Sequence, residues 1–374
     1  MKSSQFSSRI KVGVVGARGY SGQELCRMLL QHSYVDLSSV FYNEGKSFSL
    51  WQQFPDLKRV GQKNGRPEPM GYDLVSFFKS PHSLDVVFLA TPNEVSLELA
   101  DQFLKNGISV IDLSGVFRLN QTDAVASQDL YLKHYGLAHT QPKCLAQAVY
   151  GLHPFNQSAI KSLGSASIFL VANPGCYVTS VLMAIVPLLC AGLLDEQSII
   201  IDAKSGASGA GKKMSEGLLF SELYSDFYPY KVLNHQHVPE MEMYAQVFTQ
   251  LKTKVIFTPH LLPTFRGILS TCYLRWAGQV QHMSLQEKQT RVHEAFSRAY
   301  QEYPLVEFGT MKEMGSKISL KAVAGAGYTH IGYEMNDANL IVFSALDNLL
   351  KGAASQAIEN LNCIYGFPVR ESIV

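Results

Sequence analysis

The sequence lacks a membrane-length hydrophobic run, a signal-peptide-like beginning and an excess of charge of one sign. Its longest apolar run, Val181 to Leu194, contains Pro187 and is shorter than the roughly 20 residues of a membrane-spanning helix. The polar beginning, MKSSQFSSRI, has no apolar core of the kind that signal peptides carry. A formal net charge of +1 gives no electrostatic reason to expect a nucleic acid or a membrane as a partner.

The cysteines form no CxxC pair and no close Cys/His spacing. This spacing argues against a disulfide scaffold and a structural zinc site, and it favours the reducing cytoplasm. With 47% hydrophobic and 17% charged residues, the composition is that of a globular protein. The 374 residues exceed what one hydrophobic core usually organises, so two domains are expected.

The first half of the chain alternates short apolar strands with helices. Strands are expected near residues 10–15, 35–43, 84–91, 108–114 and 166–173, with helices near 20–32 and 94–107. Strands that alternate with helices pair in parallel, which predicts a doubly wound, Rossmann-like sheet. The α/β class is therefore expected for residues 1–173.

After residue 173 the alternation becomes less regular. A buried helix is expected directly after Cys176, strands at 197–206, 254–263 and 268–278, and an amphipathic helix at 284–303. This pattern predicts an α+β domain, residues 174–343, inserted into the first. The last helix, 345–366, is expected to return to the first domain, which then also includes residues 344–374.

A glycine turn follows the first strand and opens the first helix. Backbone N–H groups at such a turn can cradle a diphosphate, although G-x-x-G-x-x-G differs from the commonest dinucleotide spacing, and a turn that serves packing alone is the alternative. The candidate contacts are Gly16, Arg18, Gly19, Tyr20, Ser21, Gly22 and, on the second strand, Ser39. No acidic residue closes the second strand, and Arg18 and Lys46 can balance a 2′-phosphate, so NADP is favoured over NAD.

A second glycine-rich stretch, GASGAGKK at 206–213, nearly spells a nucleotide-hydrolysing P-loop. Lys213 stands where that loop needs the hydroxyl that holds Mg²⁺, so nucleotide hydrolysis is disfavoured. The stretch is either a loop facing cofactor or substrate, or a structural turn.

Cys176 follows Asn-Pro-Gly and opens the apolar helix, where unpaired N–H groups and the helix dipole favour an anion. An ordinary cysteine is only about 3% thiolate at pH 7, and a helix terminus alone raises that to no more than about a quarter. Full activation requires a nearby base. The segment NHQHVPEME offers His235 and His237, with Glu240 to orient an imidazole; a metal pair on an extended strand and structural histidines are the alternatives.

Sequence motifs from residue 16 to residue 362 resemble N-acetyl-γ-glutamyl-phosphate reductase, a relative of aspartate-semialdehyde dehydrogenase. The motifs are GARGYSGQEL, FLATPNEVS, VIDLSGVFRL, AVYGL, ANPGCYVTS, SGASGAG, HQHVPEME, PHLLPTFRGILST and NLLKGAASQAIENLN. Because they cover nearly the whole chain in one order, the resemblance is specific.

The resemblance implies NADPH-dependent reduction of an acyl phosphate through a cysteine thioester, in arginine biosynthesis, by a cytoplasmic homo-oligomer (dimer or tetramer) that needs no metal. Cys176 would be the nucleophile and His237 the acid/base. Substrate contacts would come from Arg118, His235 and Glu240, whereas Arg266 either binds substrate or braces its loop. The cofactor would meet the Gly16–Gly22 turn, Ser205, Gly206 and Asn348.

The chain departs from the family pattern at three places. His153-Pro154 stands where Pro-Glu is usual, Gly325-Ala326-Gly327 replaces Gly-Thr-Asn, and Val178 replaces a proline. None of these removes a candidate catalytic group. The alternatives in function are a reductase of another acyl phosphate, such as aspartyl phosphate or a carrier-linked amino-adipyl phosphate, and a non-catalytic NADP-binding sensor.

Overall fold

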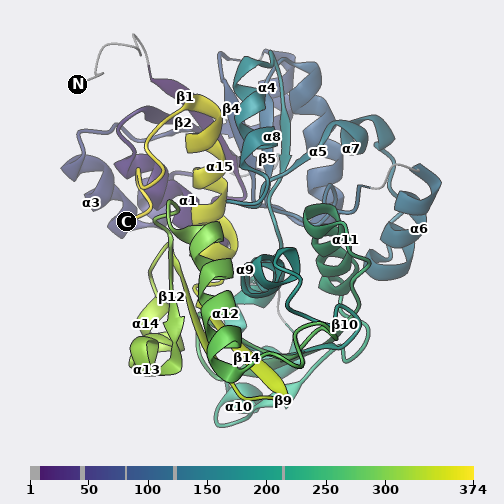
Figure 1. Cartoon of the computed structure of the whole chain (residues 1–374). Coiled ribbons are helices and arrows are strands. Elements are labelled where there is room, and N and C mark those ends of the chain that lie inside the picture. The colour runs from purple at the N-terminus through teal and green to yellow at the C-terminus, as the bar shows by residue number, and fades with distance from the viewer. Residues whose placement is uncertain (1–8, 43–46, 81, 121–123, 213–214) are drawn as a thin grey trace, which may run out of the picture. The chain divides into compact units, whose positions relative to one another are not determined.

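The computed structural model describes residues 9–42, 47–80, 82–120, 124–212 and 215–374. The chain divides into two compact units (Figure 1). The first comprises Met1–Pro174 and Ala354–Val374, and the second comprises Gly175–Ala353. No helix in these described ranges has the length and apolar character needed to cross a bilayer.

The first unit is built on a seven-stranded sheet of order β3-β2-β1-β4-β5-β7-β6, in which every pair is parallel. Its strands are β1 (Ile10–Val15), β2 (Val35–Tyr42), β3 (Met70–Asp73), β4 (Val86–Leu89), β5 (Ser109–Asp112), β6 (Val149–Tyr150) and β7 (Leu170–Ala172). Every residue of β4, β5 and β7 is buried, as expected for parallel strands covered on both faces. The order reverses beside β1, and the predicted Rossmann-like sheet is confirmed.

Helices cover this sheet, and α1 (Tyr20–Gln31) buries the apolar stripe that includes Leu25, Met28 and Leu29. The others are α2 (Leu50–Gln53), α3 (Pro55–Lys63), α4 (Leu74–Lys79), α5 (Asn93–Lys105), α6 (Ala124–Tyr135), α7 (Pro142–Gln147), α8 (Gln157–Ser162) and α15 (Ser355–Tyr365). The last of these, α15, packs against α1 and α8 (yellow in Figure 1).

The second unit is built on a mixed sheet of order β12-β13-β14-β11-β8-β10-β9. Its strands are β8 (Ile199–Gly206), β9 (Tyr228–Pro229), β10 (Val255–Leu262), β11 (Ile268–Arg275), β12 (Val306–Thr310), β13 (Thr329–Met335) and β14 (Asn339–Leu346). Parallel pairs (β8–β10, β12–β13) stand beside antiparallel ones, so the predicted α+β character is confirmed.

One helix forms the core of the second unit: α9 (Cys176–Cys190) is buried all round from Tyr177 to Leu189 and packs on β11 and β14. Around it lie α11 (His237–Thr249) and α12 (Leu285–Tyr300), the latter opened by a Ser284–Glu287 capping box. The short helices are α10 (Phe220–Leu223), α13 (Met311–Met314) and α14 (Leu320–Val323).

The expected last helix, 345–366, is wrong at its beginning. Residues up to Leu346 belong to β14, which pairs with β11 and β13, and a π-helical turn, η5 (Leu350–Ala354), precedes α15. The expected boundary at residue 344 therefore lies inside a strand of the second unit, and the first unit resumes at Ala354.

Candidate active site

The glycine turn between β1 and α1 combines packing with an open helix end. Gly16 has a φ of +88°, and a Cβ there would lie 2.2 Å from the Ala90 carbonyl oxygen. A Cβ on Gly22 would lie 2.2 Å from the Gly16 oxygen, so both positions need glycine for close packing. Packing does not explain Gly19, whose Cβ would meet nothing nearer than 3.4 Å.

Gly19 is the N-cap of α1, and neither a capping side chain nor an acidic residue in the first turn occupies that helix end. Tyr20 and Ser21, both half-buried, follow as the first residues of the helix. N–H groups at an uncapped helix start favour a diphosphate. The turn therefore fits a dinucleotide cofactor.

Arg18 is exposed on this turn, and its guanidinium lies 5.3 Å from the centre of the Phe48 ring, which follows β2 in the chain. Ser39 on β2 is only 4% exposed, and its hydroxyl lies 3.4 Å from that of Ser38, so little of it is accessible. Lys46 lies outside the described residues.

Arg118 lies at the carboxyl edge of the parallel sheet, the edge at which such sheets bind ligands. Its Nε donates to the Asn173 carbonyl and its Nη2 to the Leu113 carbonyl, each at 2.7 Å, just beyond β7 and β5. The side chain is buried. These bonds hold the guanidinium in one orientation.

Cys176 is the first residue of α9 and is half-buried, whereas the next thirteen positions, Tyr177 to Leu189, are buried. No residue in the first turn of α9 is acidic, and the N-cap, Gly175, has no side chain of its own to close this helix end. The other thiols are held protonated at neutral pH, because burial raises the pKa of Cys26 and Cys272 to about 12, that of Cys363 to about 11, and those of Cys144 and Cys190.

His237, the first residue of α11, lies directly against the residue before the thiol: a Cβ on Gly175 would be 2.5 Å from His237 Nε2. One helical turn later, fully buried Glu240 accepts a hydrogen bond from the Gly175 N–H at 2.9 Å. The beginning of α11 is thereby tied to the N-cap of α9, which brings an imidazole and a carboxylate to the start of the helix that carries Cys176.

His235 is buried before α11, and its Nδ1 accepts the His237 backbone N–H at 3.1 Å. Burial lowers the pKa of His235 to about 3, and the charge of Lys231 acts in the same direction. His235 is therefore a neutral imidazole at physiological pH. The extended-strand alternative for the two histidines is wrong, because His237 already belongs to a helix; no cluster of three metal-ligating side chains occurs within the described ranges.

Two tyrosines join this group without having been singled out from the sequence. The Tyr177 ring meets His235 edge-on at 5.6 Å and His237 at 6.1 Å between centroids. Tyr230 donates its hydroxyl to that of Tyr177 at 3.1 Å, and burial raises the pKa of both phenols. Only the adjacency of Tyr177 to Cys176 could have signalled this pair.

Ser205, Gly206 and Asn348 meet at the end of β8. A Cβ on Gly206 would lie 2.7 Å from the Arg266 nitrogen, and Ser205 Oγ bonds the Gly206 carbonyl at 3.0 Å. The buried Asn348 amide accepts from the Gly267 N–H at 2.7 Å and donates to Ser208 Oγ at 2.9 Å. These contacts fasten the loop, and Asn348 bridges two of its segments.

Arg266 pairs with a buried carboxylate: its Nε lies 3.2 Å from Asp347 Oδ2, and Asp347 has no exposed surface. This contact favours the bracing role over the substrate role. Two of the residues that depart from the family pattern make defined contacts. Gly325 donates its N–H to the same Asp347 oxygen at 2.7 Å. In the first unit, His153 Nδ1 lies 4.0 Å from Glu359 Oε1.

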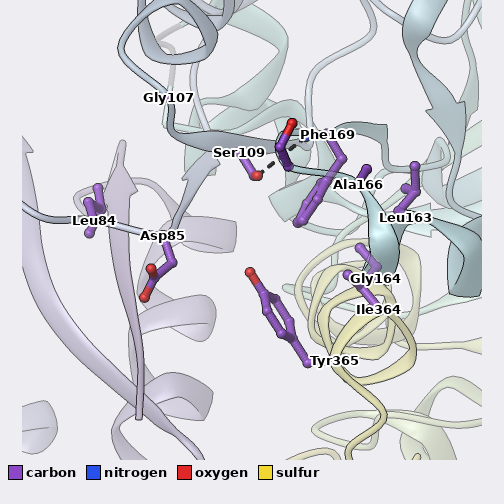
Figure 2. A pocket seen from close by; sticks show the side chains of 11 residues that line it. Leu84, Asp85, Gly107, Ser109, Leu163, Gly164, Ala166, Phe169, Ile364 and Tyr365 are labelled. Carbon is purple, nitrogen blue, oxygen red and sulfur yellow. Dashed lines mark hydrogen bonds between the residues drawn. The ribbon is translucent and has the colours of Figure 1, made fainter. Parts of the chain in front are cut away.

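The first unit also contains a cavity of about 140 Å³. Its lining, shown in Figure 2, includes Asp85, Gly107 and Phe169, which precede β4, β5 and β7. It therefore opens at the amino edge of the sheet, whereas the glycine turn and Arg118 lie at the carboxyl edge.

Comparison with known proteins gives a class and then a family. Residues 11–163 match the model of the semialdehyde dehydrogenase NAD-binding domain, and residues 176–348 match that of the semialdehyde dehydrogenase dimerisation domain. Aspartate semialdehyde dehydrogenase II from Vibrio cholerae shares the fold, with a TM-score of 0.67 at 15% identity over 96% of this chain and 98% of its own. The aspartate semialdehyde dehydrogenase with NADP from Candida albicans scores 0.64 at 14% identity, over 98% and 100%. The fold is thus that of the semialdehyde dehydrogenases.

Among curated relatives, N-acetyl-γ-glutamyl-phosphate reductase of Magnetococcus marinus is 37% identical over 96% of this chain and 95% of its own length. The Brevibacillus brevis reductase is 36% identical over 97% and 98%. The chain belongs to the N-acetyl-γ-glutamyl-phosphate reductase family, and the resemblance stated from its motifs is confirmed.

Proposed function

We propose that this chain reduces N-acetyl-γ-glutamyl phosphate to N-acetylglutamate 5-semialdehyde with NADPH and releases phosphate, as a step of arginine biosynthesis. The observation that carries the proposal is the half-buried thiol of Cys176 at the first position of α9, with the His237 imidazole packed on the preceding glycine. The family to which the chain belongs supplies the substrate and the pathway.

In this proposal His237 accepts the thiol proton, and the N-terminus of α9 stabilises the thiolate by up to about 1 kcal/mol. The sulfur then bonds to the acyl carbon while the bond from that carbon to the phosphate oxygen breaks. Phosphate leaves with the electron pair, and a thioester to Cys176 remains. A bound nicotinamide would supply the hydride that brings this acyl carbon to the aldehyde level. The bond from the carbon to the Cys176 sulfur then breaks, the electron pair returns to the sulfur, and the semialdehyde leaves.

The remaining residues orient these groups. Glu240, through the Gly175 N–H, keeps the two helix starts together, and neutral His235 offers the substrate a hydrogen bond rather than a charge. Arg118, already fixed by two carbonyls, supplies N–H donors for an anionic substrate group. Arg266 braces its loop through Asp347.

NADP is the proposed cofactor. Arg18 stands on the cofactor turn against Phe48, beyond the end of β2, and no acidic residue lies between Ser38 and Tyr42 to hold a ribose 2′-hydroxyl. Gly19, Tyr20 and Ser21 would hold the diphosphate, and Ser205, Gly206 and Asn348 would form the second part of the cofactor site.

We further propose a cytoplasmic homo-oligomer. The six cysteines are free thiols, in agreement with a reducing compartment. The second unit exposes three large apolar side chains at paired positions of its sheet, Ile200 (45%), Ile256 (52%) and Tyr273 (43%). This face fits a second copy of the chain, since the family model for residues 176–348 is described as a dimerisation domain.

The deciding assay runs the reaction in reverse: phosphate-dependent reduction of NADP⁺ with N-acetylglutamate semialdehyde or aspartate semialdehyde. We expect kcat/KM to favour the N-acetylated substrate by at least about 100-fold, or about 2.7 kcal/mol. A preference for aspartate semialdehyde would assign the chain to another acyl phosphate. No turnover with either substrate, despite NADPH binding, would support a non-catalytic sensor.

A further inference from the structure

The π-helical turn η5 places a glycine, Gly352, directly against Cys176. A Cβ on Gly352 would lie 2.7 Å from the Cβ of Cys176 and 3.3 Å from its Cα. Both of these atoms are fixed by the start of α9, so neither can swing aside as the tip of a long side chain could. Because Gly352 has no side chain, the turn can approach Cys176 this closely. Any larger residue at position 352 would displace either Cys176 or the turn.

Asp347 begins this turn. Its main-chain oxygen accepts the Gly352 N–H, five residues ahead, at 2.9 Å, which is the bond that defines a π-helical turn. Its side-chain Oδ1 accepts the N–H groups of Leu349 at 2.8 Å and Leu350 at 3.3 Å. One buried residue thus sets the geometry of the backbone that reaches Cys176.

The second carboxylate oxygen of Asp347 connects the turn to two other segments, through the Gly325 N–H at 2.7 Å and the Arg266 Nε at 3.2 Å. Directly before Gly352, Lys351 is fully buried and donates to the Tyr303 hydroxyl at 2.6 Å. A buried ammonium is costly unless it is well bonded, so this contact anchors the turn in one position. The turn is thus fastened at two residues that precede Gly352, Asp347 and Lys351.

We propose that Asp347 and Gly352 are positioning residues for the nucleophile: Asp347 shapes the turn, and Gly352 holds the first residue of α9 where its thiol can react. The proposal rests on the proposed function, in which Cys176 is that nucleophile. Displacing a reacting atom by even about 1 Å can cost about 100-fold in rate. The turn therefore acts on kcat rather than on substrate affinity.

The test compares Gly352→Ala with Gly278→Ala, an exposed glycine of the same unit whose added Cβ would meet nothing within 4 Å. For each full-length variant, kcat, KM and the pH dependence of Cys176 alkylation by iodoacetamide are measured, with the alkylated site identified by mass spectrometry. We expect Gly352→Ala to lower kcat about 100-fold, leave KM within about threefold and change the alkylation profile. Gly278→Ala should match the unmutated chain.

A Gly352→Ala variant that retains more than half of kcat and the original alkylation profile would overturn the proposal. Should that variant not fold, Asp347→Asn decides: its amide keeps an acceptor for Leu349 and Leu350 but cannot pair with Arg266 or accept from Gly325. We expect kcat to fall at least about tenfold with an altered alkylation profile, and unchanged values would again overturn the proposal. Cys176→Ser separates the two hypotheses, because an active serine variant refutes the proposed function itself.

Discussion

At the residue scale, Cys176 differs from the other cysteines in its surroundings, since it opens α9 and His237 packs on the preceding glycine. Serine at this position has a hydroxyl that neither a helix terminus nor an imidazole ionises appreciably at pH 7. We therefore predict that Cys176→Ser lowers kcat by at least about 10³-fold and leaves the Kd for NADPH, measured by fluorescence titration, within about threefold. The matched control is Cys363→Ser, whose thiol is held protonated by burial and should be dispensable. Retention of more than about a tenth of the rate would contradict covalent catalysis.

The pH dependence of activity distinguishes the role of His235 from that of His237. Because burial lowers the pKa of His235 to about 3, this group stays neutral from pH 5 to pH 9 and adds no limb to a pH–rate profile there. We predict that His237→Asn lowers kcat by roughly 10² to 10⁴ and removes a limb of the pH–rate profile, because the proton acceptor of the reaction is lost. His235→Asn should keep the limb and raise KM more than it lowers kcat. The measurement is a pH series of kcat and kcat/KM, and exchange of the two behaviours would reverse the roles.

The same shift predicts a pH dependence of stability. The pKa of His235 is lowered in the folded chain, so between about pH 6.5 and pH 3 the unfolded chain binds the additional proton, and stability falls as the pH falls. The contribution amounts to at most about 1.4 kcal/mol per pH unit. We expect His235→Asn to flatten the dependence of the unfolding free energy on pH between 6.5 and 4.5, measured by urea denaturation. A slope equal to that of the unmutated chain would show that His235 is not buried neutral.

At the scale of elements, the β1–α1 turn separates packing from ligand binding. Gly16 and Gly22 are needed for contacts within the fold, whereas the side chain of Arg18 is exposed. Arg18→Ala should raise KM for NADPH about tenfold and leave KM for NADH within about twofold, since only NADPH carries the 2′-phosphate. Lys161→Ala, an exposed cation on α8, serves as the control. Equal effects on both cofactors would exclude Arg18 from the 2′-phosphate.

At the scale of the whole molecule, the exposed apolar face of the second sheet predicts association. A stable interface buries roughly 1,200–2,000 Å², and an unpaired lysine inside it is strongly disfavoured. Sedimentation velocity should therefore find the unmutated chain as a dimer or tetramer and Ile256→Lys shifted toward monomer. Leu132→Lys replaces an equally exposed apolar residue of α6 in the first unit and should leave association unchanged. A monomeric unmutated chain, or an Ile256→Lys variant that associates normally, would contradict this interface.

Several features of the fold follow from local sequence pattern alone. The alternation of short apolar strands with helices predicts the parallel sheet, and the glycines after β1 predict an open helix start, because each depends on residues within one turn or strand. Pro174 and Gly175 likewise place Cys176 at the first position of α9, since they interrupt regular structure just before a long apolar run. Local pattern does not show where the second unit ends, because residues 339–346 form a strand only through pairing with β11 and β13.

The surroundings of the Cys176 thiol depend instead on tertiary packing. His237 and Glu240 meet Gly175 from more than 60 positions away in the chain, and Gly352 reaches Cys176 from the other end of the second unit. Tertiary packing also buries His235, which keeps its imidazole neutral. The same packing lets Asp347, which no motif distinguishes, link Arg266, Gly325 and the π-helical turn. The physical reason is that burial, close backbone approach and the direction of a hydrogen bond depend on which distant segments pack together. The periodicity and spacing of residues in the sequence do not show which distant segments pack together.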